Sequence, residues 1–482
     1  MASESVLNFT SLSYDTAMDI FSVPACNLGV SGMKYLEHRP KNTFNSESSV
    51  RFTISGNGSD YLYLPETKLK VKLRILNADG SALEAIPDAL LIPPPKSAVE
   101  EKGVEEESAG VSEEKDDTDG ASESGYVSCI NNFCNSLFDM VEVSLNECVI
   151  SNGNTGYAYK SYINTLLNSS ESVKKNRLQS AMFYPDTPGH MDDCDVTFFG
   201  GNEGLKKRHK FFNGSKPVQM LTKLDVDVFK LDRYLINGVS LGLNLHFTST
   251  PFRLMSACKT ASYKIEIMDI CLIMCHVSPS NPVLVAHQEL MKDGRMARYS
   301  YIREELRKFT IVRGSSDFVC PDMFQSKCPD RMVFALSSSS ANSGNYQLNP
   351  FNFRTYDLNY ISVTVGGTRS PYGEIKMNFD EDVYADVYEA LFCTTKPRST
   401  GEMESNSNGI TFSDFKQGYA LFSIELNPQT RSGRFYPTKK NGDVGLELRF
   451  AKPLKETVIL LCLTYTPAYF EIDNVRGIYL GK

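Results

Sequence analysis

The 482-residue sequence has no apolar segment that approaches the length of a membrane-spanning helix. Such a helix needs about 20 predominantly apolar residues, whereas the longest apolar run, Val458–Leu463, has the length of one strand. The N-terminus lacks the basic start and apolar centre of a secretory signal peptide. We therefore expect a protein without a transmembrane segment that is made in the cytosol.

The sequence also lacks an excess of basic residues. It contains 50 Lys and Arg against 58 Asp and Glu, a formal net charge of −8. Proteins that coat nucleic acid neutralise phosphates with Lys and Arg, so this balance argues against genome coating, and we expect no sequence-specific nucleic-acid binding. Tryptophan is absent, and the 12 Cys residues are spread singly along the chain. In a reducing compartment they are expected to be free thiols.

Sequence motifs for catalysis and cofactor binding are equally scarce. The phosphate-binding pattern GxxxxGK[ST] does not occur. Gly56–Gly58 begins like a dinucleotide-binding loop, but the third glycine is missing and residues 61–64 continue as a strand. A turn is therefore the better interpretation. We assign no catalytic residue and no cofactor-binding residue, and expect no enzymatic activity.

Three segments carry potential ligands. His190–Asp195 is the strongest metal candidate, but it lacks the paired spacing of zinc ligands and the carboxylate order of a calcium loop, which favours a solvated polar loop. Cys271, Cys275 and His276 lie on an expected strand, with the two thiols on one face and the imidazole on the other, a poor chelate. The basic run Lys206–Lys210 favours a solvated loop or an inter-subunit salt bridge over a phosphate site. We assign no metal ligand.

What dominates the sequence is alternation with a period of two. Residues 68–75 are apolar at every odd position and basic at every even one, which predicts a strand with one buried face. The same pattern recurs at 224–228, 239–247, 263–267, 361–365 and 446–450. Val458–Tyr465 is nearly all apolar, which predicts a strand buried on both faces. Turns at 77–80 and 440–443 separate such strands, so antiparallel β-sandwiches are expected.

Helical periodicity is limited to two short segments. Tyr159–Leu167 is one, and Val383–Leu391, with acidic residues 380–382 in its first turn, is the other. Residues 85–125 are rich in Pro, Glu, Asp, Ser and Gly, so we expect an acidic disordered insert there. A smaller polar stretch at 396–409 has the same character.

A weak internal repeat divides the chain. Residues 131–144 follow the pattern NxFx₄FDMx₂VS, and residues 349–362 follow NxFx₄YDLx₂IS. Strands expected at 223–229, 239–247 and 263–275 then correspond to those at 419–426, 444–450 and 457–465. The repeat predicts two copies of one barrel: an N-terminal arm at 1–44, barrels at 45–280 and 281–475, and a C-terminal tail at 476–482.

These segments resemble the hexon-like major capsid proteins of the Polinton/Maverick and adintovirus group. The similarity rests on RFTISGNGSDYLYL at 51–64, FYPDTPGHMD at 183–192, and the segments at 131–146, 349–359, 418–422 and 470–473. It extends from about Asn45 to Asp473, and the acidic insert departs from it. The resemblance implies an all-β fold of two tandem jelly-roll barrels without active-site residues.

The resemblance further implies a homotrimer that forms a pseudo-hexagonal capsomer of a virion. Its partners would be other capsomers, penton proteins and minor capsid proteins. Three chains with two similar barrels each provide six similar walls, which suits a hexagonal lattice. We expect Phe351 and Tyr356, in a segment rich in Tyr and Phe, to lie at the trimer interface.

Three alternatives remain open at this level. A carbohydrate-binding β-sandwich would carry a signal peptide and paired cysteines, which the sequence lacks. A metal-dependent jelly-roll enzyme would need clustered ligands, whereas His246 and His276 are isolated. A domesticated capsid gene that no longer assembles would have the same sequence features as a viral one.

Overall fold

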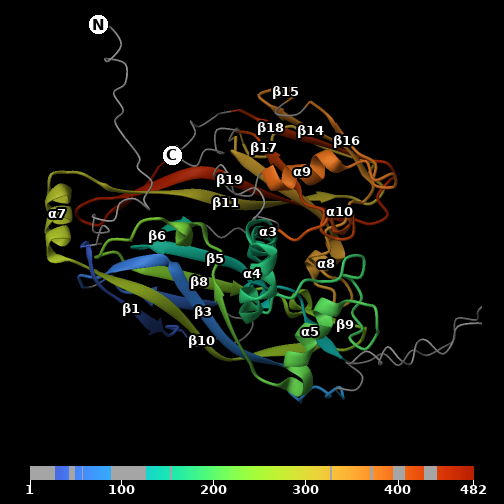
Figure 1. Ribbon diagram of the computed structural model, residues 1–482, viewed down its shortest axis with the longest axis horizontal. Coiled ribbons are helices and arrows are strands. Elements are labelled where there is room, and N and C mark those ends of the chain that lie inside the picture. Colours follow the sequence, from blue (N-terminus) through green and yellow to red (C-terminus); the bar gives the residue numbers. More distant parts are fainter. Residues whose placement is uncertain are drawn as a thin grey trace, which may run out of the picture.

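The computed structural model describes residues 28–42, 49–56, 58–87, 126–151, 155–325, 328–369, 373–393, 408–427 and 442–481. These residues form two stacked β-sandwiches with short helices in the connections (Figure 1). The expected acidic insert at 85–125 lies almost entirely outside the described residues, as does most of the polar stretch at 396–409.

The first sandwich consists of two four-stranded antiparallel sheets. One sheet has the order β1 (Val30–His38), β10 (Tyr263–Pro279), β3 (Tyr61–Asn77) and β7 (Val218–Lys223). The other has the order β2 (Val50–Ile54), β8 (Leu241–Phe247), β5 (Phe138–Leu145) and β6 (Cys148–Ser151). A small separate sheet pairs β4 (Val127–Cys129) with β9 (Leu254–Ser256).

The second sandwich repeats this arrangement. One sheet has the order β11 (Ala297–Ile311), β19 (Val458–Ile472), β13 (Arg331–Ser338) and β17 (Phe422–Glu425), with β20 (Ile478–Leu480) beside β19. The other has the order β12 (Asp317–Cys320), β18 (Val444–Phe450), β14 (Leu358–Val365) and β15 (Thr368–Arg369), with β16 (Ile375–Lys376) beside β14.

The two sandwiches share one connectivity. If the eight main strands of each unit are counted in chain order, one sheet contains the first, eighth, third and sixth, and the other contains the second, seventh, fourth and fifth. This is a jelly roll made twice, so the predicted fold class is confirmed. The internal repeat is confirmed with it, because its two copies lead into β5 and β14, the fourth strand of each unit.

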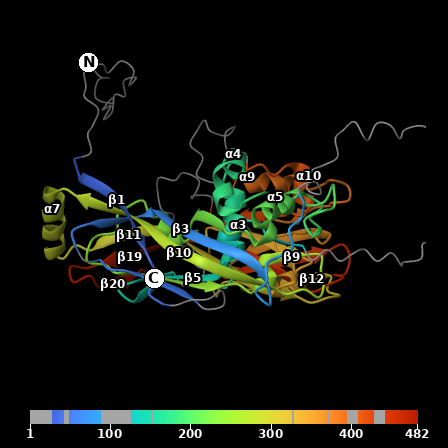
Figure 2. The same ribbon diagram turned by 90° about the horizontal axis from the view of Figure 1, so that it is seen from below.

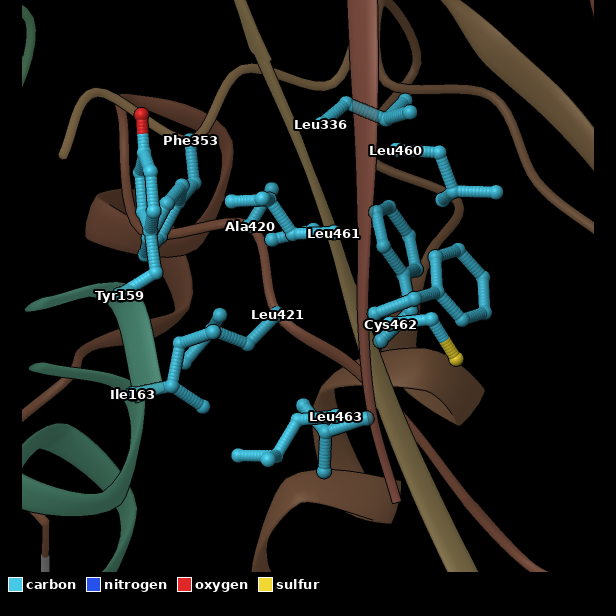
Figure 3. Close-up of a cluster of buried hydrophobic side chains, with 14 of the residues drawn as sticks. Tyr159, Ile163, Leu336, Phe353, Ala420, Leu421, Leu460, Leu461, Cys462 and Leu463 are labelled. Atoms are coloured by element: carbon cyan, nitrogen blue, oxygen red, sulfur yellow. The ribbon is translucent and has the colours of Figure 1, made fainter. Parts of the chain in front are cut away.

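Burial follows the sequence pattern along the long strands. In β3, Leu69, Val71, Leu73 and Ile75 are fully buried, while the basic residues between them are not. Strand β19 is buried at every position from Val458 to Tyr465, as its continuous apolar sequence predicted. Figure 3 shows the cause: Leu461 faces helix α3 on one side of the strand, and Leu460 and Cys462 point to the other side.

The helices lie in the connections between strands. They are α2 (Phe133–Ser136), α3 (Tyr157–Asn168), α4 (Glu171–Lys175), α5 (Glu203–Phe212), α6 (Thr250–Arg253), α7 (Asn281–Lys292), α8 (Ser339–Ser343), α9 (Ala385–Cys393) and α10 (Phe412–Lys416), with 3₁₀ turns η3 (Arg177–Ala181), η4 (Asn213–Ser215) and η5 (Asp227–Lys230). Helix α7 joins β10 to β11 at one end of the molecule (Figures 1 and 2). Among the described residues, no helix is both long and apolar enough to cross a membrane.

One local prediction was wrong, and another, the helix at 383–391, was confirmed except for its acidic first turn. The alternating residues 224–228 are not a strand, because β7 ends at Lys223 and η5 begins at Asp227. Leu224, Val226 and Val228 are nevertheless buried. The alternating pattern therefore indicated correctly which side chains are buried, although the segment is not a strand. The expected helix at 383–391 begins only at Ala385. Its acidic neighbours form a preceding turn, in which Asp382 has a φ of 57°.

The segments expected as terminal arm and tail both contain strands. Strand β1 pairs with β10 along its length and forms the edge of the first sheet. Strand β20 pairs with the end of β19. In both cases the open edge of a neighbouring strand offers backbone hydrogen-bonding groups to an apolar segment.

We expect the substitution Leu461→Ala to lower the free energy of unfolding by about 2–5 kcal/mol, because a fully buried leucine would leave a cavity. Denaturant unfolding followed by circular dichroism measures the change. The matched control is Val312→Ala, at a residue that is 62% exposed, where the change should stay within about 0.5 kcal/mol. Equal effects of the two substitutions would contradict the assignment of Leu461 to the core.

Candidate functional site at the interface between the barrels

Aromatic side chains form the centre of the contact between the two barrels. Tyr162 of α3 stacks on Phe351 with a distance of 4.1 Å between ring centroids, and Tyr159 contacts the same ring edge-on at 5.8 Å. Phe351 is fully buried within one chain. The expectation that Phe351 lies at a trimer interface was therefore wrong, because the first barrel of the same chain already covers it.

Tyr356, the second residue expected at the trimer interface, is half-buried in the same chain. Its hydroxyl donates a hydrogen bond to the Glu456 carboxylate at 3.0 Å. It has a φ of 50° and lies in the turn that leads into β14. Its position therefore supports a role in shaping this turn.

A buried ion pair lies beside the aromatic contact. The Asp186 carboxylate contacts the guanidinium of Arg208 on α5 at 2.6 Å, and both side chains are fully buried. Arg208 also donates to the carbonyl oxygens of Cys129 and Tyr184, at 2.8 and 2.5 Å. These bonds satisfy a charge that would otherwise be costly to bury.

The same carboxylate reaches the second barrel. Asn349 donates from its side-chain amide to Asp186 at 3.1 Å and to the carbonyl oxygen of Met191 at 3.2 Å. The Tyr419 hydroxyl, also from the second barrel, donates to the carbonyl oxygen of Asp186 at 2.7 Å. Asp186 thus links a helix of the first barrel to two segments of the second.

Asp192 continues this link towards the surface. Its carboxylate accepts hydrogen bonds from the backbone amide of Asn349 at 2.8 Å, from the side-chain amide of Asn352 at 2.7 Å, and from the guanidinium of Arg354. The binding of the segment at 183–192 to the segment at 349–354 was not predicted from the sequence. The prediction of a solvated loop at 190–195 was wrong for Asp192.

A glycine allows the close approach of these segments. Gly418 has a φ of 116°, and a Cβ atom there would lie 2.6 Å from the sulfur of Met191. The amide of the nearby Gly189 donates to the Gln417 carbonyl at 2.8 Å. A side chain at position 418 would be strained by its own backbone and would collide with the first barrel.

A second buried polar network lies under β11. The Glu304 carboxylate contacts Lys230 at 2.7 Å and Lys160 at 3.4 Å, and it accepts from Asn164 at 2.9 Å. Its side chain is only 6% exposed. Burial alone would raise the pKa of Glu304, but the two lysines and the amide lower it to about 2. Since Glu304 belongs to the second barrel and its partners to the first, this network also joins the barrels.

The end of the chain adds a further contact. Arg476 donates from Nε to the carbonyl oxygen of Asn237 at 2.8 Å, and its own carbonyl accepts from Asn146 at 2.9 Å. Tyr299 stacks on Phe470 at 5.0 Å, and its hydroxyl donates to the carbonyl oxygen of Tyr234 at 3.1 Å. Residues of β11 and β19, and Arg476 after β19, therefore pack on the first barrel.

The candidate ligands from the sequence are not gathered into a metal site. Within the described residues, no group of three or more His, Cys, Asp or Glu side chains could hold a metal ion. His190 contacts Asp193 at 2.8 Å near the surface. His276 contacts His38, with 3.4 Å between their Nε2 atoms, and Cys271 and Cys275 are buried in β10.

The basic run at 206–210 forms part of helix α5, so the prediction of a solvated loop was wrong. Helix α5 begins after Asn202, whose side chain accepts a hydrogen bond from the amide of Leu205 at 3.2 Å. Arg208 and His209 are buried, whereas Lys207 and Lys210 are exposed. The run divides in this way because one face of the helix packs on β4 and the other faces solvent.

Residues 238–242 have the sequence GVSLG, the pattern of a nucleophile elbow. The elbow requires a strand, a sharp turn and then a helix. Here the segment leads from a turn directly into strand β8. The amide of Ser240 is bonded to the Asn146 side chain at 2.8 Å. The pattern therefore lacks the geometry of a nucleophile.

A cleft of about 710 Å³ opens between the barrels near α8. Its charged lining residues in the described part of the chain are Lys259, Arg313, Lys455 and Glu456. Glu456 already accepts hydrogen bonds from Tyr356 and Ser338, at 3.0 and 2.7 Å. Among the described lining residues, Glu456 is the one carboxylate and there is no histidine.

We expect Asp186→Asn to lower the free energy of unfolding by about 3–5 kcal/mol, because it leaves the buried Arg208 charge without a counterion. Chemical denaturation measures the loss. The control is Glu203→Gln, which removes the ion pair to Lys206 on the same helix; Glu203 is 55% exposed, so the loss should stay below about 1 kcal/mol. A small effect at Asp186 would show that the buried Arg208 charge does not depend on this carboxylate as its counterion.

We expect stability to fall as the pH is lowered below about 6.5, the ordinary pKa of histidine. Burial lowers the pKa of His209, so the unfolded state binds the proton more readily, and the stabilisation present above this pH is lost below it. Denaturant midpoints at pH 7.5 and 5.5 measure the loss. It should be smaller in His209→Gln and unchanged in the control His190→Gln, at a half-exposed residue; equal losses in all three proteins would contradict the assignment.

Comparison with known proteins gives a consistent picture of the fold. No protein-family model matches the sequence. An uncharacterized protein of Caenorhabditis elegans, F54H12.2, is 22% identical over 446 residues, which cover 91% of this chain and 94% of that protein.

Solved structures that cover nearly the whole chain come from viruses. A chain of the Sputnik virophage superposes with a TM-score of 0.59 at 11% identity, over 98% of this chain and 92% of that one. A chain of the PBCV-1 virus capsid gives 0.52 at 9% identity, over 96% and 99%. The major capsid protein of Faustovirus gives 0.51 at 10% identity, over 93% and 92%. The chain therefore has the double jelly-roll fold of viral major capsid proteins.

Proposed function

We propose that this protein is a major capsid protein of a double-stranded DNA virus or a virus-like transposon of the Polinton and adintovirus group. The observation that carries the proposal is the repetition of one jelly-roll connectivity in a single chain, with the two copies joined by buried contacts. Residues 45–280 and 281–475 would be the two capsid barrels. Strand β1, which precedes residue 45, is the first strand of the first jelly roll, and strand β20 adds to the second beside β19.

The proposed building block is a homotrimer. Two barrels of the same connectivity give each chain two similar outer walls, so three chains around a three-fold axis present six. The buried polar network between the barrels supports this role, because a hexagonal tile requires the two barrels to keep one relative orientation. The trimers would assemble through capsomer contacts into the shell of a virion, together with penton and minor capsid proteins.

The proposed role is structural and not catalytic. The carboxylates of Asp186 and Asp192 accept hydrogen bonds across the barrel interface from Asn349, Asn352 and Arg354. Both carboxylates are thus engaged in hydrogen bonds within the chain. This arrangement supports a protein without a cofactor or a metal.

A second candidate is a host-encoded capsid gene that no longer builds particles. The observation that favours it is the similarity to a Caenorhabditis elegans protein over 91% of the chain. Such a protein would retain the fold and the trimer interface and would lose the contacts between capsomers.

We expect the purified chain to have a native mass of about 161 kDa, three times its 53.8 kDa, by light scattering on a sizing column. Electron microscopy of the concentrated trimer should show shells or hexagonal sheets. A persistent monomer at high concentration would refute the capsomer proposal. A trimer that never forms an ordered lattice would favour the host-encoded gene.

A further inference from the structure

We infer that the exposed face of strand β1 is the surface on which each first barrel binds the second barrel of a neighbouring copy of this chain. The inference rests on the proposed trimer and names the surface through which it forms. It comes from comparing two strands that occupy the same place in the two jelly rolls. One of them is covered within the chain, and the other is not.

Strands β1 and β11 are equivalent. Each is the first strand of its jelly roll and the edge strand of its sheet, and each pairs with the eighth strand. Residues 30–38 of β1 pair with residues 272–279 of β10, at the C-terminal half of that strand. Residues 297–304 of β11 pair with residues 465–472 of β19, again at the C-terminal half.

The first barrel covers this part of β11. Tyr299 and Tyr301 are 3% and 4% exposed and pack in the hydrophobic cluster of the first barrel. The Tyr299 hydroxyl accepts a hydrogen bond from the amide of Ile236 at 3.1 Å and donates one to Tyr234. Glu304 forms its ion pairs with lysines of the first barrel. The contact thus combines buried tyrosines with a polar network.

The equivalent part of β1 is uncovered. Met33 and Tyr35, on one face of the strand, are 53% and 54% exposed, and Leu36, on the other face, is 40% exposed. The strand is exposed at every residue between its two ends. Its outer edge pairs with no other strand of the described chain. An exposed edge strand with apolar side chains promotes uncontrolled association unless it is covered in the assembled state.

Charged side chains surround these apolar residues. Lys34 pairs with Asp60 at 2.6 Å, Glu37 pairs with Lys70 at 2.5 Å, and Arg39 pairs with Asp269. The ammonium group of Lys68 lies over the Tyr35 ring at 5.4 Å. An apolar centre within a rim of charged residues is the usual composition of a protein–protein interface.

The occupant follows from the repetition of the two barrels. Within the chain, the first barrel binds the first-strand edge of the second barrel. A ring of alternating barrels closes if the second barrel of one chain binds the first-strand edge of the next chain in the same way. Such a head-to-tail contact produces a closed trimer when three copies complete the rotation. The occupant of β1 is therefore the second barrel of another copy.

The inference is tested in the full-length chain by two measurements. The first is the native mass of Tyr35→Glu, which places a charge in the proposed contact. We expect the monomer fraction at a fixed concentration to rise about tenfold or more. Val312→Glu, at an exposed residue of the β11–β12 connection, is the matched control and should remain trimeric. Circular dichroism melting curves check that both variants are folded.

The second measurement identifies the partner without relying on dissociation. A photoreactive phenylalanine analogue replaces Tyr35, and irradiation of the trimer should give a product of two chains on a denaturing gel. Mass spectrometry should place the cross-linked peptide in residues 297–481 of the second copy. Cross-links only to residues 45–280, or none between chains, would overturn the inference.

The outcomes separate the inference from the proposed function. A wild-type trimer with a folded Tyr35→Glu variant that also stays trimeric would refute the β1 contact and leave the capsomer proposal intact. A wild-type protein that remains a monomer would refute the capsomer proposal itself.

Discussion

The Asp186 carboxylate is shared between the two barrels, and the arrangement of the rest of the molecule depends on it. One oxygen binds Arg208 of the first barrel and the other binds Asn349 of the second. A buried carboxylate and guanidinium are tolerated only when their hydrogen bonds are satisfied. Because Asn349 comes from the second barrel, separating the barrels would leave the second oxygen of Asp186 without this partner. The polar contact therefore fixes a relative orientation that apolar packing alone would specify less strictly.

The packing around this contact has the same consequence. Helix α3 of the first barrel places Tyr159 and Tyr162 against Phe351 of the second, and the β11 and β19 ends place Tyr299 and Phe470 in the cluster of the first barrel. Each barrel thus contributes aromatic rings that pack against the other barrel. Aromatic contacts from both units therefore join the two jelly rolls.

The sequence predicted the elements that depend on local pattern. Alternation at 68–75 gave β3, and the apolar run at 458–465 gave β19. The prediction of a strand at 224–228 was wrong, because buried apolar residues alternate there without forming a strand. The sequence also did not predict the pairing of Asp186 with Asn349, which are 163 residues apart. Nothing in the local pattern distinguishes a carboxylate in a buried bridge from one in a solvated loop.

By itself the sequence determined that the chain is all-β and that it contains one barrel twice. Period-two hydrophobicity carries this information, because each strand residue faces either the core or the opposite side. Only the tertiary structure decided which residues join the barrels and which remain exposed. Phe351 and β1 show the reason: exposure depends on what lies across the interface, and that surface belongs to residues far away in the chain.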